Sequence, residues 1–287
     1  MPMRCLLVPT GPDTDPRPRL DLAQRLSDRL TAHIALAFLS PPAEDVLAAI
    51  PEVAIAAGVT RERLELETRE AIEASRIAFD AWCTGADVVE RPAEQVRPGT
   101  TDASFTVRLG PVDAMLVQAG RLSDLILIDR PNWSDPFAAA AFDAAVFATG
   151  RPTVVVPPGP ASTDPLRKVL IAWNGSLEGT RAVALAMPLL RAAGAVAIFS
   201  APRRDENRTA ASDLAAYLAR HGIAAEILGF PDPTRAVGPV LLETADAIEA
   251  SLIVMGAYTH SRVRQFFLGG VTHHILNHAA LPVLMAH

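Results

Sequence analysis

The sequence predicts an α/β fold with two doubly wound parallel sheets in tandem. Three observations support this: uninterrupted apolar runs of strand length, apolar residues at helical spacing between those runs, and a second copy of the same order later in the chain. The run at 252–255 is apolar throughout, which is typical of a strand covered on both faces of a parallel sheet. Strands that alternate with helices favour right-handed crossovers.

The first unit is expected at residues 1–158. A helix is predicted after its opening strand, because leucines recur there at helical spacing, at Leu22, Leu26 and Leu30. The strands of this unit are predicted at 5–10, 34–41, 124–128 and 152–156.

The second unit is expected at residues 166–287, after a proline-rich linker at 157–165. Its helix carries a matching apolar stripe, and Gly194 is expected to end that helix. The stripe consists of Ala182, Leu185, Ala186 and Leu189, and the strands are predicted at 169–174, 195–202, 251–255 and 282–286. The opening strands of the two units lie 164 positions apart but the late strands only 127 and 130, so the first unit has 37 extra residues in its middle.

The extra residues fall between about 42 and 86, where a long helical pattern starts at Thr60. The charges on its polar side, including Glu65 and Arg69 at i,i+4, indicate a solvated surface, with a partner-binding helix as the alternative. The apolar side carries Leu64, Thr68, Ile72, Phe79 and Trp82.

Composition excludes several classes of protein. The chain has 287 residues, half of them apolar, and a net charge of -6, so it can bury a large core and has no basic surface for nucleic acid. No apolar run approaches the roughly 18 residues of a membrane span, and the apolar start stops at Pro9, which is too early for a signal peptide. A cytoplasmic protein without a membrane or nucleic-acid partner is expected.

Cysteine and lysine are scarce. Cys5 and Cys83 are the only cysteines, which supports neither a disulfide framework nor a zinc site. Lys168 is the only lysine and precedes a strand, so a Walker-type phosphate site and a catalytic lysine are not predicted. His274 and His278 have the i,i+4 spacing of metal ligands, but no nearby carboxylate orients them, and a surface helix is the simpler interpretation.

The segment from 251 to 286 has the pattern of an anion site. A strand ends at Gly256, a loop follows, and Gly269 and Gly270 open a helix. Such a loop can present backbone N–H groups and a helix amino terminus to an anion.

This segment resembles the carboxyl-terminal motif of the universal stress protein family, which reads Gly, two residues, Gly, nine residues, Gly, then Ser or Thr. Gly256 and Gly269 match, whereas Thr259 replaces the second glycine and Gly270 replaces the Ser or Thr. Thr259 is β-branched and resists positive φ. The resemblance implies Rossmann-like, five-stranded sheets, and tandem units that pair through their last strands as an intramolecular pseudo-dimer.

In ATP-binding members of the family this loop surrounds the ribose and phosphates, so the resemblance implies ATP or another adenine nucleotide, with or without Mg²⁺, as the cofactor. Asn174 stands where an Asp is usual and keeps a hydrogen-bond acceptor. Trp173 either stacks on a base or packs in the core, and 174–176 also fit a turn with a helix cap. The expected nucleotide-binding residues are Trp173, Asn174, Gly256, Thr259, His260, Arg262, Gly269, Gly270, Val271 and Thr272.

The first unit lacks this pattern. Its opening strand leaves through 9–12, and Ala139 and Ala140 stand where the displacement places the two helix-opening glycines. It is interpreted as a degenerate half, retained for pairing or for a different ligand.

Three functions remain open. The first is a universal-stress-type binding and regulatory protein of the stress response, with no catalytic residue, an unknown protein partner and a possible homodimer. The second is a structural dimerisation module with an empty nucleotide site. The third is a weak ATP hydrolase, although 256–270 contain no Asp or Glu that could act as a base or bind a metal. No hydrolase, zinc-protease or dinucleotide-binding motif occurs, so the sequence favours a protein that is not an enzyme.

Overall fold

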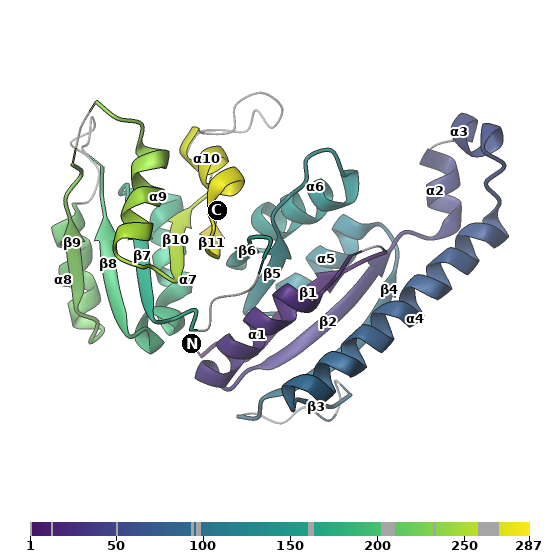
Figure 1. Cartoon of the computed structure of the whole chain (residues 1–287), viewed down its shortest axis with the longest axis horizontal. Helices are drawn as coiled ribbons and strands as arrows, with labels where there is room; N and C mark the ends of the chain where they lie inside the picture. The colour runs from purple at the N-terminus through teal and green to yellow at the C-terminus, as the bar shows by residue number, and fades with distance from the viewer. Residues whose placement is uncertain are drawn as a thin grey trace.

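The computed structural model describes residues 2–12, 14–49, 51–92, 95, 99–159, 164–201, 210–231, 234–257 and 270–287 (Figure 1). Helices and strands alternate along both units. The helices are α1 (Arg17–Leu30), α2 (Ala43–Ala49), α3 (Pro51–Ala56), α4 (Arg61–Ala86), α5 (Val112–Arg121), α6 (Pro136–Asp143), the π-helix η2 (Ala144–Ala148), α7 (Leu177–Ala192), α8 (Ala211–Arg220), α9 (Val237–Ala247) and α10 (Gly270–His278).

All described strands belong to one eleven-stranded sheet. They are β1 (Cys5–Thr10), β2 (His33–Ser40), β3 (Val89–Glu90), β4 (Asp102–Leu109), β5 (Leu125–Asp129), β6 (Thr153–Val156), β7 (Lys168–Ala172), β8 (Ala195–Phe199), β9 (Ala225–Leu228), β10 (Leu252–Gly256) and β11 (Val283–Ala286). Their order is β3-β4-β2-β1-β5-β6 in the first unit, followed by β11-β10-β7-β8-β9 in the second.

The two units meet at β6 and β11, which pair antiparallel with Val155 opposite Val283. Neighbouring strands within each unit are parallel, as in β1 with β2 and β10 with β11. The carboxyl ends of the first unit's strands therefore lie at one edge of the sheet, and those of the second unit lie at the opposite edge. Ligands of open α/β sheets bind beyond the carboxyl ends of the strands, so each unit has its own candidate edge for ligand binding, called its carboxyl edge below.

The predicted two-unit α/β architecture and the pairing of the last strands are confirmed. The two sheets are continuous rather than separate, and the first unit has a sixth strand, the two-residue β3. Helices cover both faces of the sheet (Figure 1). One apolar core lies under α1, α4, α7 and α8, and a second lies under α5, η2, α9 and α10. Among the described residues, no helix is long and apolar enough to cross a membrane.

The extra residues of the first unit form α2, α3 and the long helix α4, which extends past the end of the sheet (Figure 1). Only the second half of α4 reaches the core, where Phe79 and Trp82 are buried. The expected pair between Glu65 and Arg69 is wrong in detail, because the Glu65 carboxylate pairs with Arg61 at 2.6 Å. Arg69 instead donates to the backbone carbonyl of Glu65 at 3.2 Å.

Gly194 lies two residues beyond the end of α7, close to the predicted boundary. Its role is close packing, since a Cβ at this position would lie 2.8 Å from the backbone oxygen of Arg167. Within the linker, the structure describes 157–159 and 164–165.

Candidate functional site

The carboxyl edge of the second unit brings together the ends of β7 and β10 and the amino terminus of α7. At this edge Gly256, the last residue of β10, contacts the first turn of α7. A Cβ on Gly256 would lie 2.5 Å from the backbone nitrogen of Gly179 and 2.7 Å from the carbonyl carbon of Glu178. Any side chain here would therefore push the helix away from the sheet, which gives this glycine a packing role.

The turn between β7 and α7 is held by its own polar side chains. The Asn174 carboxamide oxygen accepts a hydrogen bond from the Ser176 N–H at 3.1 Å. Ser176 caps α7, because its hydroxyl oxygen accepts from the Gly179 N–H at 3.1 Å. Gly175 between them has φ of 69°, a conformation that favours glycine. The turn-and-cap interpretation of 174–176 therefore describes the local geometry, and the side chain of Asn174 remains exposed at the edge.

Trp173 lies inside the molecule. Its side chain belongs to the core under α1, α4, α7 and α8, and the residue is only 6% exposed. Its backbone N–H donates to the backbone oxygen of Phe199 at 2.8 Å, which joins the ends of β7 and β8. The geometry fits the packing interpretation of this tryptophan better than base stacking.

The described part of α10 begins at Gly270, which is exposed, and a Cβ on this residue would have no atom of the described residues within 4 Å. Val271 is half-buried, and Thr272 is buried at 6% exposure. The first N–H groups of a helix have no partner inside the helix, so an exposed helix start can receive an anion. Four of the expected binding residues lie outside the described residues, namely Thr259, His260, Arg262 and Gly269.

The histidines of α10 pack on one another and on α9. The rings of His274 and His278 are stacked at 4.3 Å between centroids, and the His278 Nδ1–H donates to the His274 carbonyl oxygen at 2.8 Å. Gly238 of α9 leaves room for the His274 ring, which would lie 2.9 Å from a Cβ there. Partial burial, together with His278 and His273, lowers the pKa of His274. Among the described residues, no cluster of three or more potential ligands could hold a metal ion.

The first unit fills its own carboxyl edge with an ion pair. Asp129 ends β5 and lies 127 positions before Gly256, so it occupies the equivalent strand end. Its carboxylate lies 3.0 Å from Nε of Arg19, a residue of α1 that is only 3% exposed. The guanidinium also donates to the backbone oxygens of Pro9 and Asp15. Burial raises the pKa of Asp129 and lowers that of Arg19, while each partner opposes the shift of the other.

The corresponding strand end and first helix of the second unit meet through glycines, whereas those of the first unit meet through the pair of the buried Arg19 and the more exposed Asp129. A guanidinium whose donors are turned toward protein oxygens takes up the space and the hydrogen-bonding groups at that edge. The interpretation of the first unit as lacking the glycine pattern therefore has a structural counterpart in Arg19 and Asp129.

The comparisons with known proteins agree with this geometry. The sequence model of the universal stress protein family matches residues 234–287, which contain the glycine motif. A universal stress protein from Archaeoglobus fulgidus superimposes with a TM-score of 0.67 at 14% identity, covering 98% of this chain and 95% of that one. A second structure, from Pseudomonas aeruginosa, gives a TM-score of 0.53 at 15% identity, with 99% and 93% covered. Residues 234–287 therefore resemble the universal stress protein family in sequence, and the whole chain shares its fold with solved universal stress proteins.

No curated protein sequence matches this chain significantly. The low identities to the solved structures show a common fold only. They cover both units, so the shared fold extends over the whole chain.

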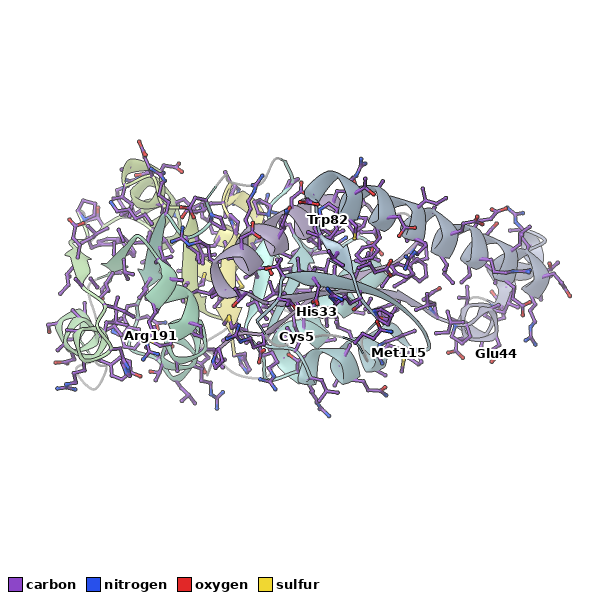
Figure 2. All side chains as sticks on the ribbon, turned by 90° about the horizontal axis from the view of Figure 1, so that it is seen from below. Cys5, His33, Glu44, Trp82, Met115 and Arg191 are labelled. Carbon is purple, nitrogen blue, oxygen red and sulfur yellow. The ribbon has the colours of Figure 1, made fainter. Side chains whose placement is uncertain are left out.

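One polar cluster in the first unit was not expected from the sequence. His33 begins β2 and lies beside Cys5 of the neighbouring strand, near the middle of the molecule (Figure 2). Its Nδ1–H donates to the Asp102 carboxylate at 2.6 Å, and its Nε2 lies 2.8 Å from the Ser104 hydroxyl. His33, Asp102 and Ser104 are at most 8% exposed.

Two further groups reach the second carboxylate oxygen of Asp102. The Thr100 hydroxyl donates to it at 2.9 Å, and Nε of Arg91 lies 3.3 Å away. The order Asp, His, Ser resembles that of a nucleophilic triad, but the Ser104 hydroxyl is buried and the cluster lies at the amino ends of β2 and β4. We therefore interpret it as a satisfied polar network that joins these two strands.

Proposed function

We propose that this chain is a universal-stress-type protein that binds ATP or another adenine nucleotide at the carboxyl edge of the second unit, and acts as a binding and regulatory protein in the stress response. The observation that carries the proposal is the exposed residue Gly270 at the start of α10, which lies within the segment that matches the family model. A helix amino terminus offers unpaired N–H groups and the positive end of the helix dipole to phosphate.

The roles of the other residues follow from their chemistry and belong to the same proposal. Gly269, Gly270, Val271 and Thr272 present the helix start to phosphate, and Arg262 and His260 add side-chain donors. Asn174 faces the sugar or base from the end of β7, while Gly256 keeps β10 close to α7 so that the edge retains its shape. Trp173 supports the edge from the core, and Thr259 is proposed to contribute to the same site.

A structural module with an empty site is the second candidate. The geometry of Asn174 and Trp173 favours it, because the Asn174 oxygen already accepts from Ser176 and the Trp173 ring is buried. The units pair through β6 and β11 in a way that needs no ligand. The two candidates make opposite predictions for nucleotide binding.

The test is a calorimetric titration of the whole chain with ATP, ADP, AMP and cAMP, with and without Mg²⁺, on wild type and two variants of Gly270. Gly270→Asp adds a negative charge at the start of α10, and Gly270→Asn adds a neutral side chain of nearly the same shape. Both residues are favourable at helix starts, so neither is expected to impair folding.

Wild type is expected to bind at one site per chain. Gly270→Asn is expected to keep most of the affinity. Gly270→Asp is expected to weaken binding about tenfold or more, since a like-charge repulsion of about 1.4 kcal/mol corresponds to a factor of ten. No heat with any nucleotide would contradict the proposal and support the empty module. Equal losses in both variants would show that bulk, and not charge, matters at this position.

A further inference from the structure

Two side-chain contacts join the first unit to the elements on either side of positions 258–269. The first is made by Arg130, the residue after β5. Its guanidinium donates to the backbone oxygen of Asn277 at 3.0 Å and to that of Ala279. Both oxygens belong to the last turn of α10 or follow it directly. The last carbonyls of a helix lack partners within the helix, and a cation there also stabilises the helix dipole.

The second contact reaches Ala257, the residue after Gly256. The His287 Nδ1–H donates to the Ala257 carbonyl oxygen at 3.0 Å. The ring of His287 packs edge to face on Phe147 of the first unit, with 5.0 Å between the centroids and 75° between the planes. The backbone that leaves β10 is therefore held by a side chain that itself rests on the first unit.

The residues at the equivalent positions of the other unit cannot make the same side-chain contacts. The displacement of 127 residues places Ala257 of the second unit where the first has Arg130. The displacement of 130 residues places His287 of the second unit where the first has Pro157. Neither alanine nor proline has a side-chain donor. At these positions side chains of the first unit therefore hold elements of the second unit, and the second unit makes no matching contact to the first.

We propose that the first unit is a positioning partner for the nucleotide site of the second unit, with Arg130 as its main positioning residue. The inference rests on the proposed function and gives the degenerate half a role in it. Arg130 holds the far end of α10, the helix whose start is offered to phosphate, and Phe147 supports the residue at the other flank through His287. A helix fixed before the ligand arrives loses less conformational freedom on binding, so the affinity is higher.

The test compares wild type with Arg130→Ala, Arg130→Lys and a control, Arg151→Ala, in the whole chain. Arg151 also donates to a backbone oxygen, that of Arg121, but within the first unit. The measurements are ATP affinity by calorimetry, the thermal midpoint, and amide hydrogen exchange of α10 without nucleotide.

Arg130→Ala is expected to weaken ATP binding about three- to tenfold and to speed amide exchange in α10, because an exposed helix end opens more readily. Arg130→Lys is expected to restore part of both, since lysine also bonds to terminal carbonyls. The Arg151→Ala control is expected to keep wild-type affinity and wild-type exchange in α10, even if its thermal midpoint falls as far as that of Arg130→Ala.

The outcomes separate this inference from the proposed function. If wild type binds ATP, and Arg130→Ala binds it equally well with unchanged exchange in α10, the positioning role is overturned. If wild type binds no nucleotide, the proposed function fails, and the exchange data alone decide whether Arg130 orders α10. Unchanged exchange in that case also overturns the positioning role, whereas faster exchange confined to α10 supports it.

Discussion

Replacing His33 by alanine is expected to lower the free energy of unfolding by about 3 kcal/mol, because it leaves the buried carboxylate of Asp102 without its closest partner. That carboxylate is 1% exposed, and the His33 ring lies 2.6 Å from it. Thr100 and Arg91 still reach the other carboxylate oxygen, so the cost is expected at the lower end for a broken buried pair. The measurement is chemical denaturation followed by circular dichroism.

Two further variants separate the contributions within this network. Ser104→Ala removes only one hydrogen bond to His33 and is expected to cost about 1 kcal/mol. The double variant His33→Ala/Asp102→Ala is expected to cost less than the sum of its single variants, since no charge is then left buried alone. A cost below about 1 kcal/mol for His33→Ala would contradict the network's role, because removing one partner of a buried pair costs more than that.

Replacing Gly256 by alanine is expected to destabilise the second unit by about 1–3 kcal/mol through overpacking. The added Cβ would meet backbone atoms of α7, at 2.5 Å from the nitrogen of Gly179, and backbone cannot move aside as a flexible side chain can. α7 and β10 must therefore separate. The thermal midpoint and the denaturation midpoint report this loss.

The matched control for this variant is Gly85→Ala in α4. No atom lies within 4 Å of a Cβ there, and the glycine lies inside a helix. The Gly85→Ala substitution is expected to leave the stability of the protein unchanged or to raise it by about 0.5–1 kcal/mol, since alanine is the better helix former. Equal stability changes in the two variants would show that Gly256 is not a packing position.

Most of the architecture was predictable from apolar runs. The strands that begin at Cys5, His33, Ala195 and Leu252 lie within one or two residues of the predicted runs at their starts, because a strand buried on both faces has few polar residues. Similar segments repeated at nearly constant spacings predicted the tandem arrangement, and the pairing of the last strands followed from the family resemblance. The structure adds that this pairing is antiparallel.

The strands β4 and β9 were not predicted, because their apolar residues are interrupted by polar ones. In β4 the polar residues include Asp102 and Ser104, which are buried and share His33 of β2 as a hydrogen-bond partner. His33 and Asp102 are 69 positions apart, so only the pairing of β2 with β4 brings them together. The sequence held one indirect signal, a histidine directly before an apolar run.

The elements that flank the proposed site were predicted in position, whereas the packing of their residues was not. The motif located the end of β10 and the start of α10, and the structure places Gly256 and Gly270 there. The packing of Gly256 against Gly179 depends on how closely α7 approaches the sheet, which a spacing pattern does not contain. Arg19 and Asp129 are 110 positions apart, although an arginine three residues before Leu22 lies on the apolar side of α1 and was a usable signal.

The second unit is proposed to bind the nucleotide and the first unit is not, and this difference between the units is the central claim. Amide hydrogen exchange of the whole chain, measured with and without saturating ATP, tests this claim most directly. We expect protection at the start of α10 and around Asn174 and Gly256, with no change around Arg19 and Asp129. Protection around Arg19 and Asp129, or unchanged exchange throughout the chain, would contradict it.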